Sequence, residues 1–177
     1  MFVEAEDGRF WRHHGIDLVQ IRRALAHDFE IGAAGRGGST ITQQVAKNLF
    51  LSGERTIGRK LEESVLAWRI ESLVGKRRIL ELYLNLVELG PGVYGLGAGA
   101  RHWFGKDLGS LSLDEAAQLA ALLPAPRRGK DAAFARRLSQ LRARLPGLTR
   151  EERESPMGAG PAEHATATLA SAPSTSP

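Results

Sequence analysis

Hydrophobic residues recur along much of this chain at the three- and four-residue spacing of a helix, and the pattern is clearest in residues 38–50. As a helix, this segment places apolar residues on one side and a hydroxyl, an amide and an ammonium on the other. The apolar side comprises Ile41, Val45 and Leu49, and the polar side comprises Ser39, Gln43 and Lys47. An ordinary surface helix explains the apolar stripe but not this choice of polar groups. We therefore expect the polar side to bind an anionic, oxygen-rich ligand.

The same periodicity predicts further helices over about residues 17–27, 57–74, 76–88, 95–104, 112–123 and 131–145. Asp17 and Ser112 can cap two of them, and each is followed three residues later by the Gln or Glu of a capping box. In the helix 57–74 we expect an apolar inner face, made of Ile57, Leu61, Val65 and Trp68, with Arg59 and Glu63 on the far side. Strand patterns are almost missing, so the predicted fold is mostly α-helical.

With 177 residues and 42% hydrophobic content, the chain can bury one core. We expect one folded domain over residues 1–150 and a disordered tail over 151–177, where Pro, Ala, Ser and Thr dominate. The glycine-rich stretch 32–38 is expected to be a mobile loop. Cysteine is absent, which excludes disulfides and thiolate metal sites.

The formal charge of +4 hides an asymmetry, because the first 150 residues hold 23 basic and 16 acidic groups and so carry close to +7. Such a surface suits nucleic acid, anionic lipid headgroups or a phosphorylated substrate, and equally an ordinary soluble protein. The sequence contains no run of about 18 apolar residues, and its first residues lack the basic segment followed by an apolar segment that is typical of a signal peptide. It therefore predicts neither a membrane-spanning helix nor an export signal.

Two glycine-rich stretches resemble nucleotide-binding motifs but lack the required context. Residues 90–95 match the GxGxxG consensus of a dinucleotide-binding turn. Residues 32–39 partly match the consensus of a phosphate-binding loop. Neither follows a predicted strand, and in the second Gly38 stands where the motif requires lysine. We therefore predict no nucleotide site.

Residues 6–17 concentrate carboxylates, aromatic rings and histidines. Glu6 and Asp7 are adjacent, and neighbouring carboxylates raise each other's proton affinity, which can make a glutamate a base near neutral pH. From spacing alone a solvated pair is the simpler explanation. His13 can equally be a packing or capping residue, and the chain has no HExxH pairing for a metal ion.

A second polar cluster consists of Arg55, Arg59, Lys60 and Glu63. By itself, an exposed Arg59–Glu63 pair one helical turn apart would contribute only about 0.2–0.5 kcal/mol. The order in which the motifs follow one another gives the cluster more weight.

Taken in order, the motifs resemble the peptidoglycan glycosyltransferase family, which comprises the transglycosylase domains of bifunctional penicillin-binding proteins and the monofunctional transglycosylases. The matching segments are Glu6-Asp-x-x-Phe-x-x-His13-x-Gly, Gly38-Ser-Thr-Ile-Thr-Gln-Gln-x-x-Lys-Asn-x-Phe50, Arg59-Lys-x-x-Glu63, Lys76-x-x-Ile-Leu-x-x-Tyr-Leu-Asn85, Trp103-Phe-Gly-Lys106 and Leu111-Ser-Leu-x-Glu-Ala-Ala-x-Leu-Ala120. The likeness covers about residues 2–126, and so many ordered motifs are not expected by coincidence.

The resemblance implies a mostly helical, lysozyme-like domain with two lobes around a central cleft. It implies that lipid II disaccharides are joined with inversion into β-1,4-linked glycan, while undecaprenyl pyrophosphate leaves. Expected partners are lipid II, the growing strand, the membrane surface and other cell-wall synthesis proteins, and not nucleic acid. The expected location is the periplasmic face of the bacterial inner membrane. No resident cofactor is expected, although Mg²⁺ or another divalent ion can accompany the pyrophosphate.

The resemblance also assigns roles to residues. Glu6 is expected to be the general base, and Glu63 a second catalytic glutamate that organises cations or a divalent ion near the donor phosphates. The residues expected to bind substrate are Ser39, Thr40, Gln43, Gln44, Lys47, Asn48, Arg55, Arg59 and Lys60. Those expected to hold the Glu6 loop in shape are Asp7, Phe10 and His13.

The chain departs from the family pattern at its start. Family members normally have a membrane helix and a lead-in segment there, whereas only five residues precede Glu6, so we expect a truncated chain of the monofunctional type. Substrate capture would then depend on basic and apolar surface, with Leu49, Phe50 and Leu51 as candidates. Two alternatives stay open: a lysozyme-like lytic enzyme that releases soluble muropeptides, and an inactive truncated module that binds glycan or lipid headgroups.

Overall fold

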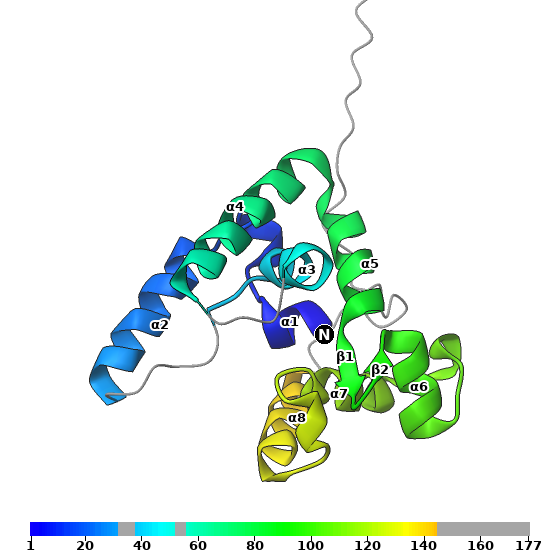
Figure 1. The fold of residues 1–177 in the computed structure, drawn as a ribbon. Helices are drawn as coiled ribbons and strands as arrows, with labels where there is room; N and C mark the ends of the chain where they lie inside the picture. Colours follow the sequence, from blue (N-terminus) through cyan, green and yellow to red (C-terminus); the bar gives the residue numbers. More distant parts are fainter. Residues whose placement is uncertain (32–37, 52–55, 145–177) are drawn as a thin grey trace, which may run out of the picture.

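The computed structural model describes residues 1–31, 38–51 and 56–144, and the protein is mostly helical, as predicted (Figure 1). Its α-helices are α1 (Phe2–Glu6), α2 (Leu18–Ile31), α3 (Ile41–Phe50), α4 (Ile57–Leu73), α5 (Lys76–Leu86), α6 (Leu96–Phe104), α7 (Leu113–Leu122) and α8 (Ala132–Arg144). The 3₁₀ helices are η1 (Phe10–Arg12), η2 (Leu108–Ser110) and η3 (Pro126–Arg128), and the strands are β1 (Glu88–Gly90) and β2 (Val93–Tyr94). The predicted loop 32–38, apart from Gly38, and the predicted tail 151–177 lie outside the described residues.

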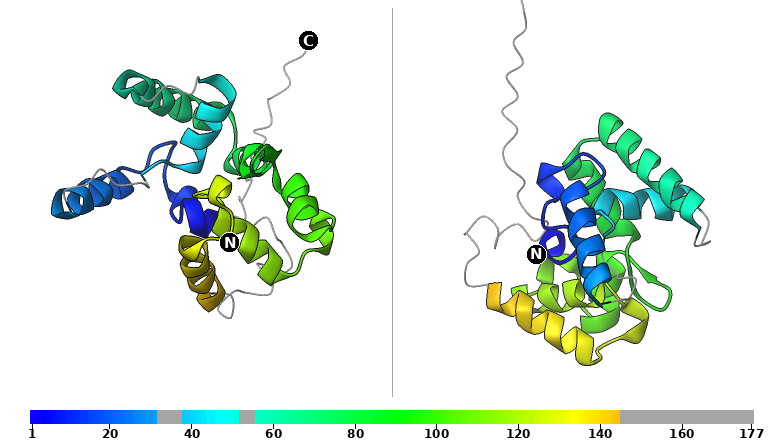
Figure 2. Two further views of the ribbon diagram at one scale, coloured as in Figure 1. Left: turned by 60° about the horizontal axis from the view of Figure 1, so that its bottom comes forward. Right: turned by 90° about the vertical axis from the view of Figure 1, so that its left-hand side faces the viewer.

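The helices form two groups that α5 connects. On one side α3 packs against α4 and α5, and on the other α7 packs against α8, α6, β1 and α1. In Figure 1, α4 lies across the top and α5 descends from its end to the β hairpin beside α6 and α7. Figure 2 shows α2 extending away from the remaining helices. The helical class is thus confirmed, while a central cleft between two lobes stays a prediction.

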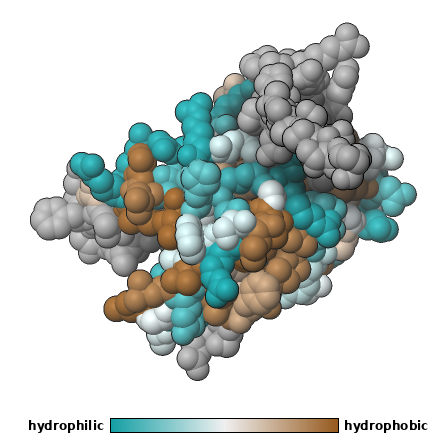
Figure 3. Space-filling model, turned by 90° about the horizontal axis from the view of Figure 1, so that it is seen from above, coloured by the Kyte–Doolittle hydropathy of each residue, from teal (hydrophilic) through white to brown (hydrophobic). Residues whose placement is uncertain are grey.

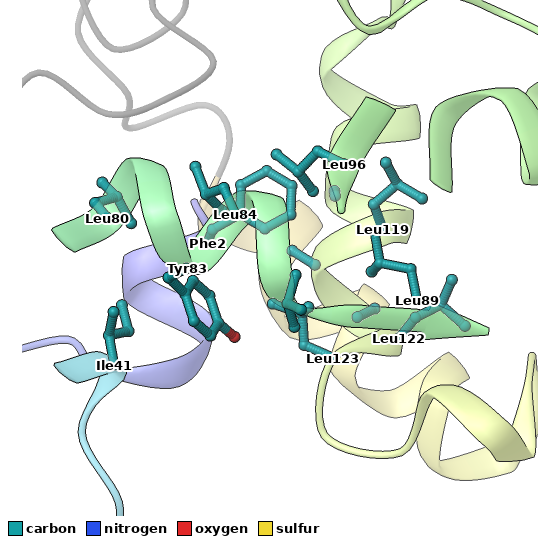
Figure 4. Close-up of a cluster of buried hydrophobic side chains, with 14 of the residues drawn as sticks. Phe2, Ile41, Leu80, Tyr83, Leu84, Leu89, Leu96, Leu119, Leu122 and Leu123 are labelled. Carbon is teal, nitrogen blue, oxygen red and sulfur yellow. The ribbon is translucent and has the colours of Figure 1, made fainter. Parts of the chain in front are cut away.

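Helix α7 forms the centre of the core. Ser112 caps it, because its side chain accepts a hydrogen bond from the Glu115 backbone while the Glu115 side chain accepts one from the Ser112 backbone, as predicted. Leu119 and Leu122 are fully buried and pack with side chains from α1, α5 and β1 (Figure 4). Burial of one leucine contributes about 1.5–3 kcal/mol, so α7 is a principal source of stability.

The predicted orientation of the helix over 57–74 is wrong. The four apolar residues expected inside are largely exposed on α4: Ile57 by 84%, Leu61 by 65%, Val65 by 58% and Trp68 by 59%. Glu63, expected on the far side, is only 2% exposed. Figure 3 views the molecule from above, and brown apolar side chains lie open on that face between teal hydrophilic ones.

The reason for this inversion is that the body of the protein accommodates the small and polar side of α4. Gly15 adopts a φ of 79° and lies so close to α4 that an added Cβ would come within 2.8 Å of the Ala67 carbonyl. On the same side, the Ser64 hydroxyl accepts a hydrogen bond from Gln43 Nε2 at 3.0 Å. Periodicity locates an apolar stripe but does not say which face of the helix the neighbouring elements cover.

Smaller differences concern the ends of elements. The helix predicted to reach residue 88 ends at Leu86, and a two-stranded hairpin follows with Glu88 paired to Tyr94. Strands of three and two residues are too short to show a period of two in sequence. Asp17 caps α2 by accepting from the backbone of Val19 and Gln20. Gln20 Oε1 has no partner among the described residues, so only half of that predicted capping box is seen.

Candidate active site

Glu6 is the last residue of α1, and its carboxylate is held from a neighbouring helix. Phe2 is 5% exposed and anchors the start of this short helix in the core. Gln44 Nε2 of α3 donates to Glu6 Oε2 at 3.0 Å. The structure thus joins one predicted base and one predicted substrate-binding residue across 38 positions of sequence.

Burial raises the pKa of the Glu6 carboxyl above its ordinary value of 4.5. The Gln44 hydrogen bond opposes this rise, as do the charges of Arg137 and Lys47, whereas the negative charge of Asp7 adds to it. Asp7 therefore raises the pKa of Glu6, as expected of an adjacent carboxylate, although burial is the larger cause. A carboxylate with a raised pKa is a stronger base once it is ionised.

Asp7 connects the Glu6 loop to the start of α3. It is 1% exposed, and its Oδ2 accepts hydrogen bonds from the Ile41 backbone at 3.0 Å and from His13 Nε2 at 2.9 Å. The free N–H groups and positive dipole end of a helix N-terminus stabilise a carboxylate there. These contacts tie the Glu6 loop to α3, and the supporting role of Asp7 and His13 stays a prediction.

The polar residues of α3 divide into internal and exposed groups. Thr40 precedes the helix as its cap, is 0% exposed, and donates to Gly15 O at 2.6 Å. Gln43 is 1% exposed and completes the capping box with Thr40. Both were expected to bind substrate, yet their side chains are used to fix the start of α3. Lys47 and Asn48 are exposed on the later turns.

The structure also corrects the two-sided pattern of residues 38–50. Ser39 lies before the helix rather than on it, since α3 begins at Ile41. Gln43, from the predicted polar side, is buried, whereas Leu49, from the predicted apolar side, is 44% exposed. Helix α3 packs against α4 and α5, and its buried residues lie in the first part of the helix, whereas residues 47–50 are exposed.

Glu63 is the centre of the predicted cation cluster. Arg59 Nη1 donates to Glu63 Oε2 at 2.9 Å, and Lys60 Nζ donates to Glu63 Oε1. Lys60 Nζ also donates to Ser39 Oγ at 2.7 Å, which brings the cluster to the start of α3. Two cations surround one carboxylate, so the three residues keep a net positive charge that can attract phosphate oxygens. Arg55, the fourth predicted member, lies outside the described residues.

Sequence reasoning missed a further polar network behind Asp7. Glu71 Oε1 accepts from Thr42 Oγ1 at 2.5 Å and from Lys76 Nζ at 2.6 Å. The Lys76 ammonium also lies 4.3 Å from the centre of the Phe10 ring, a cation–π contact. Lys76 and Phe10 each stand in a family motif, which was the available signal, but only the fold shows that they meet.

The donor set does not fit a divalent ion held by the protein. Within the described part of the chain, no three His, Cys, Asp or Glu side chains are grouped as metal ligands would be. Both Glu63 oxygens already accept from Arg59 and Lys60, so Glu63 does not offer them freely to a cation. Glu63 pairs with cationic side chains in this structure, and its role near the donor phosphates stays a prediction.

These features define the class of protein. The sequence model of the transglycosylase family matches residues 1–145, so the chain belongs to this family. The chain is 55% identical over 125 residues to penicillin-binding protein 1A of Aquifex aeolicus, an overlap that covers 71% of this chain and 17% of that protein. It is 49% identical over 125 residues to the biosynthetic peptidoglycan transglycosylase of Methylobacillus flagellatus, covering 71% of this chain and 55% of that protein.

A third relative, the biosynthetic peptidoglycan transglycosylase of Shewanella amazonensis, is 53% identical over 124 residues, covering 70% of this chain and 50% of that protein. The chain thus spans about half the length of these curated transglycosylases and less than a fifth of the penicillin-binding protein. The family match extends into α8, beyond the segment 2–126 where the sequence motifs were found.

Proposed function

We propose that this chain polymerises peptidoglycan glycan strands from lipid II, with Glu6 as the general base. The observation that carries the proposal is the state of Glu6, a partly buried carboxyl with a raised pKa that Gln44 holds at the end of α1. The family's relatives named as peptidoglycan transglycosylases support the substrate class.

The acceptor hydroxyl of a sugar is a poor nucleophile, so a base must take its proton as the new bond forms. In the proposed step, that oxygen attacks the anomeric carbon of the donor from the face opposite the pyrophosphate, which inverts the configuration. The proton passes to Glu6, and the bonding electrons leave with undecaprenyl pyrophosphate. The product is a β-1,4-linked strand.

The leaving pyrophosphate carries concentrated negative charge, which cationic donors stabilise. Arg59 and Lys60 are held in place by Glu63, and Lys47 lies exposed on α3, the helix that Ser39 precedes. We propose that these three cations bind the donor phosphates, together with Arg55, while Ser39, Gln44 and Asn48 bind sugar or phosphate oxygens. Thr40 and Gln43 position α3 for them. Any Mg²⁺ would enter with the pyrophosphate.

The same proposal places the chain at the periplasmic face of the bacterial inner membrane, where lipid II and other wall-synthesis proteins would meet it. Leu49 is 44% exposed and Phe50 62% exposed at the end of α3, so apolar surface is available beside Lys47. Apolar side chains next to basic ones favour binding to an anionic lipid surface. No helix in the described ranges is long and apolar enough to cross a bilayer.

A lipid II polymerisation assay with Glu6→Gln tests the proposal. Because Gln cannot take up the proton, we expect the rate to fall about 10²–10⁴-fold. Glu4→Gln is the matched control, since Glu4 lies on the same helix but is exposed and paired with Arg144. The control should keep the parent rate.

The products decide between the alternatives. Long glycan strands from lipid II support polymerisation, whereas soluble muropeptides released from finished wall would instead identify a lytic enzyme. Binding of glycan or lipid without any product would identify an inactive module. Polymerisation by Glu6→Gln at the parent rate would show that Glu6 is not the base.

A further inference from the structure

A series of contacts behind Glu6 joins helices α3, α4 and α5 to the segment that follows α1. Lys76, the first residue of α5, donates from Nζ to Glu71 Oε1 of α4 at 2.6 Å. Thr42 of α3 donates from its hydroxyl to the same Glu71 oxygen at 2.5 Å. The Lys76 ammonium also lies 4.3 Å from the centre of the Phe10 ring in η1. One lysine thus contacts both the helices and the segment next to the candidate base.

These contacts close into a ring. The Phe10 backbone N–H donates to the Asp7 carbonyl at 2.8 Å, and the Asp7 carboxylate accepts from the Ile41 backbone at 3.0 Å. Ile41 is followed directly by Thr42, which leads back to the lysine. We term this ring the Lys76 circuit, and its members are Asp7, Phe10, Ile41, Thr42, Glu71 and Lys76.

The direction of the Glu6 side chain depends on this circuit. Helix α1 has only five residues, and a helix of that length is not stable without tertiary contacts. Glu6 is its last residue, directly before Asp7, and its Oε2 accepts from Gln44 Nε2 of α3 at 3.0 Å. Gln44 lies two residues after Thr42 on the same helix. Both sides of the contact that holds Glu6 are therefore fixed next to members of the circuit.

Lys76 differs from the lysine of an ordinary surface pair. Its side chain is 19% exposed, that of Glu71 is 4% exposed, and Phe10 is 0% exposed. An ion pair and a cation–π contact are both stronger where water is scarce. By contrast, Arg78 and Glu81 on the same helix form an exposed pair of the kind that contributes little. The contacts of Lys76 favour a role in holding the fold around Glu6 over a role in holding substrate.

We propose that Lys76 is a positioning residue, which ties the segment after α1 to α3 and so keeps Gln44 against Glu6. The inference rests on the proposed function in treating Glu6 as the base. Lys76 acts on the reaction through Glu6 and without touching substrate. A small misplacement of a reacting group lowers the rate of the chemical step even when the substituted residue is remote from it.

Kinetics with lipid II separate positioning from substrate binding. Lys76→Met is combined with Glu71→Gln, because a buried carboxylate without its cation would by itself destabilise the fold. We expect kcat to fall about 10–10²-fold while KM stays within about twofold of the parent value, since a misplaced base slows the reacting step and leaves substrate binding intact. Lys76→Arg keeps the positive charge and can still face an aromatic ring, so it should recover most of the rate.

Adding Phe10→Leu shows whether Lys76 acts through the ring. This change removes the aromatic face and leaves the ion pair between Lys76 and Glu71 in place. If the lysine acts through Phe10, the loss of kcat in the combined variant should be smaller than the product of the separate losses. If Lys76 only stabilises the corner between α4 and α5, the losses multiply, and that result would overturn the proposal. Arg78→Met is the matched control, because it removes an exposed ion pair of 2.7 Å from the same helix and should keep the parent kcat.

The placement of Glu6 can also be measured without lipid II. In a crystal structure of Lys76→Met with Glu71→Gln, we expect the separation of Gln44 Nε2 and Glu6 Oε2 to grow from 3.0 Å to more than about 3.5 Å. An unchanged separation, or a parent kcat, would overturn the proposal. Should this variant fail to fold, Thr42→Val gives the same test, because it keeps the shape of the side chain and removes only the hydroxyl that donates to Glu71. This measurement needs no turnover, so the positioning role can fail while the proposed function stands, and the reverse.

Discussion

The contact between α3 and α4 and the contact between α7 and α8 are built in different ways. Helices α7 and α8 contribute apolar side chains to the core, among them Leu119, Leu122, Phe134, Leu138 and Leu141. Helices α3 and α4 are joined by polar pairs, Gln43 with Ser64 and Thr42 with Glu71. Apolar contact needs shape and volume only, whereas each polar pair needs one donor facing one acceptor. The directional contact is the one beside the candidate site.

The largest effect on stability is expected in the apolar region. Leu119→Ala leaves a cavity beneath α7, where Leu119 is 0% exposed, and should lower the free energy of unfolding by about 2–5 kcal/mol. Urea denaturation followed by circular dichroism measures it. Leu73→Ala, at a leucine 82% exposed at the end of α4, should change the free energy little. Equal losses in both variants would contradict the core described here.

In the polar region we expect a smaller loss of stability together with a loss of activity. Asp7→Asn weakens the acceptor that serves both His13 and the Ile41 backbone, and should cost about 1–3 kcal/mol. Polymerisation should also fall, because the Glu6 loop loses its link to α3. Asp107→Asn serves as the control, since the Asp107 side chain is 85% exposed. A variant with parent stability would show that the link is dispensable.

The raised pKa of Glu6 predicts how the stability of the site depends on pH. Folded protein binds the Glu6 proton more tightly than unfolded protein, so this residue favours folding below pH 4.5 and that contribution is lost as pH rises through the folded-state pKa. Glu6→Gln has no such loss. We expect it to match the parent protein in acid and to exceed its stability at neutral pH, as measured by denaturation across pH. If the difference in free energy of unfolding between Glu6→Gln and the parent protein stayed constant across this pH range, the raised pKa would be contradicted.

The smallest effect is expected on the outer face of α4. Leu61→Ser should change the free energy of unfolding by no more than about 0.5 kcal/mol, because Leu61 is 65% exposed. Leu84→Ser, at a leucine 2% exposed on α5, is the matched comparison and should be severely destabilising. If the two substitutions lowered the free energy of unfolding equally, α4 would have the orientation that its hydrophobic pattern predicted.

The predictions from sequence succeeded where a local rule was sufficient. Ser112 and Glu115 cap α7 through contacts between residues three apart. Their capping-box pattern in the sequence was enough to place the start of that helix. The failure at α4 has a different origin. Arg59 and Lys60 beside Glu63 pair with it, but this face of α4 is also contacted by residues from elsewhere in the chain: Ser39 accepts from Lys60, and Gly15 lies against Ala67.

The candidate site divides in the same way. Glu6, Asp7 and Glu63 could be named from their motifs, and the structure gives each of them specific partners. Lys76 and Phe10 also stood in motifs, but no sequence rule predicts that the Lys76 ammonium lies over the Phe10 ring. The two residues are far apart in the sequence, and only the fold brings them together.

By itself, the sequence of this protein determined its helical class, the caps of its central helix and the identity of the carboxylates and cations that belong to its family's motifs. Only the tertiary structure decided which face of α4 is covered and that Thr40 and Gln43 are occupied in fixing α3. The physical reason is range: propensity and capping act over a few residues, whereas burial and charge depend on every group that folding brings near.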